Sequence, residues 1–187
     1  MVLRGRDGET RTYPVVETVQ RDHICHVVRA PAAISDGVRD QARQIVLKAV
    51  EAIDGVGVFG VELFELQDGR VLYNEIAPRP HNSGHYTIEG CVTSQFENHI
   101  RAVLGWPLGS TELVRSAAVM VNVLGTFQGD APADAAAPAL AMPDAHVHIY
   151  AKRDVRPGRK MGHVTALADT VDVAEAIAHQ AADLVKL

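Results

Sequence analysis

One segment, residues 57–77, restricts the possible folds of this chain more than any other. It contains two apolar runs on either side of the tetrapeptide Gln67-Asp68-Gly69-Arg70. Asp-Gly readily adopts the positive φ angles of a two-residue type I′ turn, so the segment predicts an antiparallel β-hairpin. With Asp68 and Gly69 as the loop residues, the facing pairs are Leu66 with Val71, Phe64 with Tyr73, and Glu62 with Glu75.

Two glutamates, Glu62 and Glu75, are therefore predicted to face each other. Opposed side chains have Cβ atoms roughly 4.5–5.5 Å apart, and like charges so placed destabilise a sheet. Apolar flanks predict partial burial, which raises that cost. A bound cation would compensate, and two carboxylates suit Mg²⁺ or Mn²⁺ better than zinc. The alternative is a solvated face on which each glutamate is exposed and paired with an arginine.

The loop after the second strand concentrates polar and charged side chains. Residues 74–85, NEIAPRPHNSGH, contain one acid, one arginine, two histidines, an asparagine and a serine. An ordinary loop, in which Asn and Ser bond the backbone, is the alternative to a binding loop. Because a solvated loop does not need this mixture, the segment favours the cation site over the solvated face.

The remaining pattern predicts an α+β protein with antiparallel sheets and packed helices. Apolar spacings of three and four predict a helix over 35–54, begun by Ser35 and ended by Gly55. We expect a subdomain boundary near Leu113, dividing the chain into residues 1–112 and 113–187. The other expected elements are three strands within 1–29, a helix at 93–104, strands at 117–124, 146–150 and 163–167, an exposed excursion or short helix at 130–145, and a helix from 171.

Composition excludes several classes of protein. The 47% apolar and 22% charged residues are typical of a globular protein, and the net charge of -5 with no Lys/Arg stripe argues against a nucleic-acid partner. No apolar run approaches the roughly 20 residues of a membrane-spanning helix. Two widely spaced cysteines, Cys25 and Cys91, favour a reducing, cytoplasmic setting over a disulfide framework.

Two other motifs carry no site. Residues 55–60 match the dinucleotide pattern GxGxxG, but they follow a predicted helix and open a strand. A dinucleotide loop requires the reverse order, because a helix N-terminus must receive the pyrophosphate. His146 and His148 share a strand face without a third ligand, so we do not interpret them as a metal site.

Beyond these local patterns, almost the whole chain resembles a known family. The family is 5-(carboxyamino)imidazole ribonucleotide synthase, the ATPase subunit of phosphoribosylaminoimidazole carboxylase, which is a member of the ATP-grasp superfamily. NEIAPRPHNSGH is the most specific of the matching motifs. The resemblance is carried by YPVVE at 13–17, HVVRAPA at 26–32, FGVELF at 59–64, NEIAPRPHNSGHYT at 74–87, CVTSQFENHIRAVLGWPLG at 91–109, HIYAK at 148–152 and RPGRKMGH at 156–163.

The resemblance implies a reaction. Family members use ATP and bicarbonate to carboxylate aminoimidazole ribonucleotide in purine biosynthesis, by way of carboxyphosphate. It also implies that Glu62 and Glu75 bind Mg²⁺, in agreement with the need for a metal to neutralise transferring phosphates. Many ATP-grasp enzymes carry Asn two residues after the second glutamate. Here that residue is Ala77, which matches the carboxyaminoimidazole branch and argues against another purine-pathway substrate.

Further roles follow from the resemblance alone. Arg79 resembles the arginine that holds bicarbonate or carboxyphosphate, a planar anion suited to a guanidinium group. Arg79 and His81 are thereby the implied catalytic residues, and His81, Asn82 and Ser83 resemble substrate contacts. Lys152 and Arg159 resemble the cations that reach the ribonucleotide phosphate. Without the resemblance, the basic turn at 152–160 reads as a solvated surface.

The resemblance also implies that the chain is the C-terminal half of such an enzyme. Its fold would be the C-terminal ATP-grasp lobe, 1–112, carrying the metal, plus a small β-rich subdomain, 113–187, completing the phosphate site. We expect the missing N-terminal half to be needed for activity, and we expect a homodimer because the family is commonly dimeric. The alternative is a non-catalytic ATP-grasp remnant that binds a ribonucleotide or mediates assembly.

Overall fold

The computed structural model describes all residues, 1–187, and they form two compact units. Unit 1 comprises Met1–Val16 and Pro31–Val114, and unit 2 comprises Glu17–Ala30 and Arg115–Leu187. Each unit combines an antiparallel sheet with packed helices, so the predicted α+β class is confirmed. No helix combines the length and the apolar character needed to cross a membrane.

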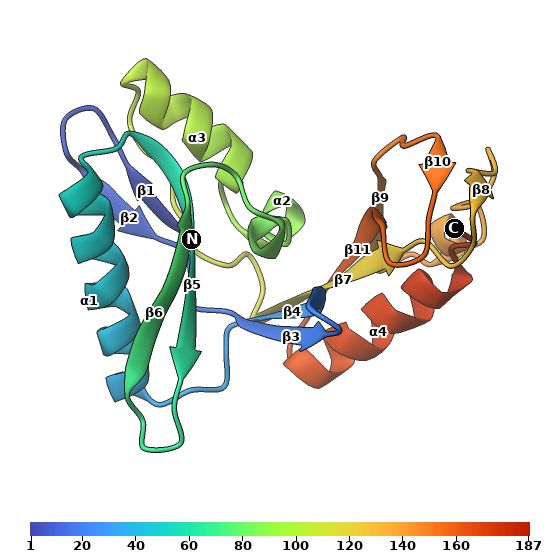
Figure 1. Cartoon of the computed structure of the whole chain (residues 1–187), viewed down its shortest axis with the longest axis horizontal. Coiled ribbons are helices and arrows are strands. Elements are labelled where there is room, and N and C mark those ends of the chain that lie inside the picture. The colour runs from blue at the N-terminus through green and yellow to red at the C-terminus, as the bar shows by residue number, and fades with distance from the viewer. The chain divides into compact units, whose positions relative to one another are not determined.

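Unit 1 is built on a four-stranded antiparallel sheet in the order β2-β1-β5-β6. In Figure 1, helix α1 runs along this sheet beside β5 and β6. Its elements are β1 (Val2–Arg4), β2 (Thr10–Thr12), α1 (Asp36–Ile53), β5 (Gly57–Glu65), β6 (Val71–Ala77), the 3₁₀ turn η1 (Asn82–Gly84), α2 (Thr87–Gly90) and α3 (Gln95–Leu104).

Helix α1 begins as predicted but ends differently. The Ser35 side chain accepts the Val38 N–H, so this cap is confirmed. At the other end the left-handed residue is Asp54, not Gly55, and Ile53 is exposed rather than part of the buried face. The helix packs against the apolar face of the sheet through Val50, where the core also contains Val2 and Phe59, with Val46, Leu47, Val61 and Ile76 around them.

The β5–β6 hairpin confirms one predicted pair and corrects the turn. Glu62 does face Glu75, but the loop has three residues, Gln67 to Gly69, closed by a Leu66 N–H to Arg70 O bond of 2.9 Å. Gly69 alone takes a positive φ, 78°, so the loop is not type I′. The outer pairs are therefore Phe64 with Leu72 and Leu63 with Tyr73.

A β-bulge compensates for the longer loop. Between the pairs Glu62–Glu75 and Leu63–Tyr73, residue Asn74 has no counterpart on β5. The extra loop residue shifts the register by one position, and the bulge shifts it back. The two glutamates face each other because these two irregularities cancel.

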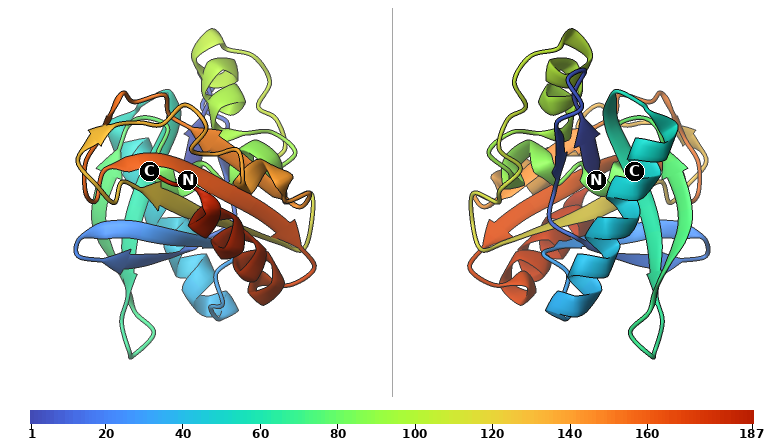
Figure 2. Two further views of the ribbon diagram at one scale, coloured as in Figure 1. Left: turned by 90° about the vertical axis from the view of Figure 1, so that its right-hand side faces the viewer. Right: turned by 90° about the vertical axis from the view of Figure 1, so that its left-hand side faces the viewer.

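Unit 2 is built on a five-stranded antiparallel sheet in the order β3-β4-β7-β11-β9. Helix α4 lies across one face of this sheet and packs on β7 and β11 (Figure 2, left). The elements are β3 (Glu17–Arg21), β4 (Ile24–Ala30), β7 (Ala117–Leu124), β8 (Gly129–Asp130), the 3₁₀ turn η2 (Ala139–Ala141), β9 (Ala145–Ile149), β10 (Asp154–Val155), β11 (Lys160–Ala168) and α4 (Val171–Leu184).

The Ala/Pro-rich segment is more than an exposed excursion. It does contain a short helical turn, η2, but Ala135 and Ala139 are buried in the core of unit 2. They pack in one cluster with Met161, Val164 and Ala181. Alanine at these positions contributes apolar contact without a bulky side chain, so a sequence that looks low in complexity is part of the packing.

A bidentate ion pair between Arg29 and Glu175 joins β4 to α4 within unit 2. Arg29 donates from Nε and Nη2 to the two carboxylate oxygens of Glu175, both at 2.7 Å, and from Nη1 to Glu17 at 2.8 Å. The Arg29 and Glu175 side chains are only 28% and 21% exposed. The hydrogen bonds from Arg29 are the main reason that the pKa of Glu175 is lowered.

We predict that Glu175→Gln lowers the free energy of unfolding by about 1–2 kcal/mol at pH 7. Because the folded-state pKa of Glu175 is lowered, its contribution is complete above the unfolded-state pKa and is lost as the pH falls through the folded-state value. Urea unfolding from pH 7 down to pH 3 should therefore show the wild-type advantage shrinking with acid. Asp183→Asn, an exposed carboxylate on the same helix, is the control; an equal effect of both variants would contradict the prediction.

Candidate active site

The two glutamates lie on the face of the unit 1 sheet that α1 does not cover. Phe59 and Val61 point into the core under α1, and side chains alternate along a strand, so Glu62 points to the opposite face. Its side chain is 36% exposed, and Glu75 is exposed. Partial burial is thus confirmed for Glu62 but not for Glu75. The apolar residue Phe64, which was expected to help bury the pair, is itself exposed.

His81 joins the two carboxylates. One ligand atom from each of Glu62, Glu75 and His81 lies within 4.8 Å of the other two. Nε2 of His81 is 3.7 Å from Oε1 of Glu62, and the His81 side chain is 15% exposed. The structure therefore brings a strand, its hairpin partner and the following loop together at one point, as the sequence pattern predicted for the glutamates.

A glycine makes room for this histidine. A Cβ added to Gly60 would lie 2.6 Å from Cβ and 2.7 Å from Cγ of His81, closer than real atoms approach. Gly60 precedes Glu62 by two residues and so points to the same face of β5. His81 can lie over the strand beside the carboxylates only because this position has no side chain.

The loop of Asn82 and Ser83 is ordered by local hydrogen bonds. Nδ1 of His81 is 2.8 Å from Oγ of Ser83, and the Asn82 carbonyl accepts the His85 N–H at 3.1 Å. Arg79 is exposed, and its Nη1 donates to the Pro80 carbonyl at 3.0 Å. The guanidinium group therefore has further N–H donors to offer a ligand.

The basic turn lies in unit 2. Lys152 Nζ donates to the Lys160 carbonyl at 2.5 Å and lies 5.3 Å from the centre of the Tyr150 ring. Arg159 Nη1 donates to the Asp154 carbonyl at 2.7 Å. Desolvation first, and then the charges of Arg159 and Lys160, lower the pKa of Lys152. Clustered cations of this kind would be stabilised by an anion such as a phosphate.

The donor set fits a hard divalent cation. Glu62 and Glu75 offer carboxylate oxygens on one open face, which leaves room for water and phosphate oxygens in the coordination sphere. An Mg²⁺ ion held there would neutralise phosphate charge during phosphoryl transfer. The neighbouring loop offers donors for an anionic substrate, so the arrangement suits a reaction on phosphates and carboxylates.

Sequence reasoning missed two residues at this site. In the sequence, Gly60 stands out only as part of the GxGxxG pattern and of FGVELF, and Gln95 only as one residue of the CVTSQFENHIRAVLGWPLG motif. Gln95 is fully buried, and its amide bonds the backbone of His81. The close spacing of NEIAPRPHNSGH and TSQFE was visible in the sequence, but nothing in either motif indicates that they touch.

With this geometry in view, comparison with known proteins gives the family. Residues 1–96 match the ATP-grasp domain, and residues 118–177 match the phosphoribosylaminoimidazole carboxylase C-terminal domain. The chain therefore belongs to the ATP-grasp family, in the branch that carries this C-terminal domain.

The particular relatives agree. The chain is 49% identical over 175 residues to phosphoribosylaminoimidazole carboxylase of Schizosaccharomyces pombe, covering 91% of this chain and 32% of that protein. It is 49% identical over 179 residues to N5-carboxyaminoimidazole ribonucleotide synthase of Mycobacterium leprae, covering 88% and 39%.

Solved structures give the same result. N5-carboxyaminoimidazole ribonucleotide synthetase of Thermotoga maritima matches 99% of this chain and 50% of its own, with a TM-score of 0.88 and 49% identity. The Aspergillus clavatus synthase, solved with ADP and 5-aminoimidazole ribonucleotide, matches 98% and 49%, with a TM-score of 0.89 and 46% identity. The chain thus spans about a third of the curated relatives and about half of these solved chains.

We predict that Gly60→Ala displaces His81 and lowers the free energy of unfolding by about 1–3 kcal/mol, because the added methyl group overlaps the histidine. The φ angle at Gly60 is not positive, so the backbone itself tolerates alanine. Gly37→Ala in α1 is the control, since its nearest neighbour would lie at 4.0 Å and alanine favours helix. Urea unfolding and NMR signals of the His81 ring are the measurements. Unchanged stability with an unchanged His81 ring would contradict the prediction.

Proposed function

We propose that this chain supplies the metal-binding and substrate-binding half of an ATP-dependent ligase. The reaction is the carboxylation of aminoimidazole ribonucleotide with bicarbonate to give 5-(carboxyamino)imidazole ribonucleotide, in de novo purine biosynthesis. The observation that carries the proposal is the convergence of Glu62, Glu75 and His81 at one face of the sheet. The names and bound ligands of the relatives support the choice of reaction.

Glu62 and Glu75 are proposed to hold Mg²⁺, or Mn²⁺ in its place. When bound with ATP, the metal supplies charge neutralisation at the phosphate oxygens. The two carboxylates fix where the metal lies, and their opposed placement is costly without a cation. This cost is the physical reason to prefer a metal over a merely solvated pair.

Arg79 and His81 are the proposed catalytic residues beside the metal. The exposed guanidinium group of Arg79 matches the planar shape and charge of bicarbonate or carboxyphosphate. The His81 ring lies close enough to Glu62 for both to meet one small ligand. Asn82 and Ser83 are proposed to contact the ribonucleotide through their side-chain amide and hydroxyl groups.

Lys152 and Arg159 are proposed to bind the phosphate of the ribonucleotide. Their side chains are anchored by carbonyl groups of their own turn, which limits the entropy lost on binding. In this proposal, residues 1–112 carry the metal and substrate contacts, and residues 113–187 complete the phosphate site.

We further propose a cytoplasmic, homodimeric enzyme. Two free cysteines support the reducing compartment.

The test is complementation in a chimera. Joining the N-terminal half of the Thermotoga maritima synthetase to this chain should give ATP hydrolysis that depends on aminoimidazole ribonucleotide and bicarbonate. We predict that Glu75→Gln lowers its kcat at least about 100-fold, because a metal ligand is lost. Glu65→Gln removes the same charge from the opposite face of the hairpin and should leave kcat unchanged.

Two results would contradict this account. A folded chimera with undiminished activity in Glu75→Gln would exclude the metal assignment. A folded chimera that binds aminoimidazole ribonucleotide in calorimetry but hydrolyses no ATP would favour the non-catalytic alternative, a ribonucleotide-binding remnant.

A further inference from the structure

Gln95, the first residue of α3, is fully buried beneath the loop that carries His81 and His85. Its Oε1 accepts the His81 N–H at 2.9 Å, and its Nε2 donates to the His81 carbonyl at 2.8 Å. The same Nε2 lies 2.9 Å from Nδ1 of His85. A single side-chain amide thus contacts both peptide groups of one loop residue and the ring of another.

The orientation of this amide follows from the backbone. The His81 N–H can only donate, so the atom facing it must be the oxygen of Gln95, and the atom facing the His81 carbonyl must be the nitrogen. Both hydrogens of the NH₂ group are then assigned, one to that carbonyl and one to His85. Nδ1 of His85 must therefore accept, so that ring carries its proton on Nε2.

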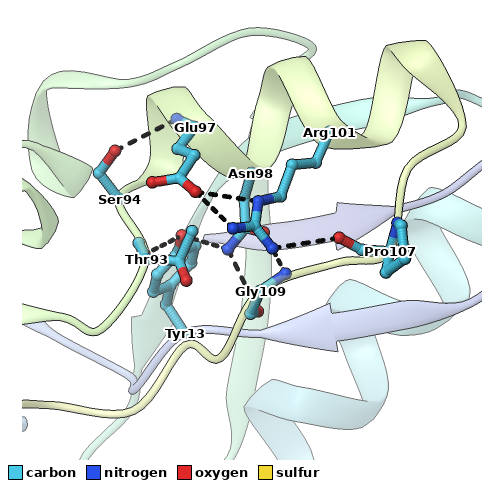
Figure 3. A network of polar contacts seen from close by, with 8 residues as sticks. All are labelled: Tyr13, Thr93, Ser94, Glu97, Asn98, Arg101, Pro107 and Gly109. Carbon is cyan, nitrogen blue, oxygen red and sulfur yellow. Dashed lines mark hydrogen bonds and ion pairs between the residues drawn. The ribbon is translucent and has the colours of Figure 1, made fainter.

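The helix that carries Gln95 is itself fixed. Asn98, also fully buried, accepts the Gly109 N–H at 2.7 Å and donates to the Tyr13 hydroxyl at 2.9 Å, and that hydroxyl donates to the Thr93 carbonyl at 2.8 Å. Figure 3 shows these contacts converging on the first turns of α3. Burial raises the pKa of Tyr13, so its hydroxyl stays a donor.

The loop side of the contact is equally close. A Cβ added to Gly84 would lie 2.5 Å from Oε1 of Gln95. The buried Thr87 hydroxyl accepts the Gln95 N–H at 2.9 Å and donates to the Gly84 carbonyl at 2.6 Å. The loop that carries His81 is therefore held against the start of α3 both by the Gln95 side chain and by the hydrogen bonds of Thr87.

We propose that Gln95 is a positioning residue, whose amide fixes the backbone of His81 and holds the His85 ring in the Nε2-protonated form. The inference rests on the proposed function, because it concerns the loop that carries the proposed substrate contacts. Gln95 itself is fully buried, so we assign it no substrate contact. It acts by holding the His81 peptide groups, so that the His81 ring stays packed on Gly60 and close to Glu62.

The charge and shape of the side chain are both required. Glutamate has nearly the same volume but no hydrogen to donate, so two acceptors, the His81 carbonyl and Nδ1 of His85, would face a carboxylate. Protonation of Nδ1 of His85 would relieve one of these contacts. Leucine would remove the bonds to all three partners, and burial leaves no water to replace them at this position.

The test is NMR of the histidine rings in the 187-residue chain at pH 7, without ligand. We expect ¹⁵N shifts that place the His85 proton on Nε2 in the wild type, and protonated Nδ1 in Gln95→Glu. Gln44→Glu makes the same exchange at an exposed position and should leave His85 unchanged. A wild-type His85 with its proton on Nδ1, or a folded Gln95→Glu with an unchanged ring, would overturn the inference.

A second measurement, Mn²⁺ affinity, tests whether the loss of Gln95 affects the proposed metal site. Mn²⁺ titration of Gln95→Leu should show roughly tenfold weaker binding than the wild type, with Gln44→Leu unchanged. Equal Mn²⁺ affinity in wild type and Gln95→Leu would overturn the positioning role. If the wild type binds no Mn²⁺, the proposed metal function fails, and the His85 spectra alone still decide whether the amide holds the loop.

Discussion

The repulsion between Glu62 and Glu75 is the constraint around which the candidate site is built. Two carboxylates opposed on one face of a hairpin raise the energy of the sheet unless a cation lies between them or water screens them. The structure keeps them opposed through a three-residue loop and a compensating bulge at Asn74. The free energy of the pair therefore favours binding of a divalent cation, which is what phosphoryl transfer from ATP requires.

The residues around Glu62 and Glu75 allow the loop that carries His81 to lie close to strand β5. Gly60 leaves the space, Gln95 holds the backbone, and His81 occupies the gap between them. Preorganisation of this kind places polar groups at fixed distances before a ligand arrives, so less entropy is lost on binding. In unit 2 the cations Lys152 and Arg159 are likewise anchored by carbonyl groups. Unit 1 thus presents two carboxylates with Arg79 following them in the loop, and unit 2 presents two anchored cations.

Local patterns in the sequence predicted most of the fold. The strand 117–124 matches β7 residue for residue, α1 begins at its predicted cap, and the closing helix begins at Val171 as expected. The facing glutamates were also predicted, although from a wrong turn type. Asp68-Gly69 permits both a two-residue and a three-residue loop, and no local signal announces the bulge at Asn74.

The contacts that sequence could not predict are tertiary. The overlap of Gly60 with His81 depends on how the loop folds back on β5, and the bonds from Gln95 depend on where α3 docks. Buried alanines at 135 and 139 were hidden in a segment of low complexity for the same reason. Such contacts join elements whose own sequences specify only helix, strand or loop.

The most direct test of the account is to locate the metal. Crystals of the chain soaked in Mn²⁺ should show an anomalous peak between the carboxylates of Glu62 and Glu75, and no such peak in Glu62→Gln crystals. A peak bound only elsewhere on the chain, or a peak that persists at this position in Glu62→Gln, would contradict the claim that the two opposed glutamates form the metal site.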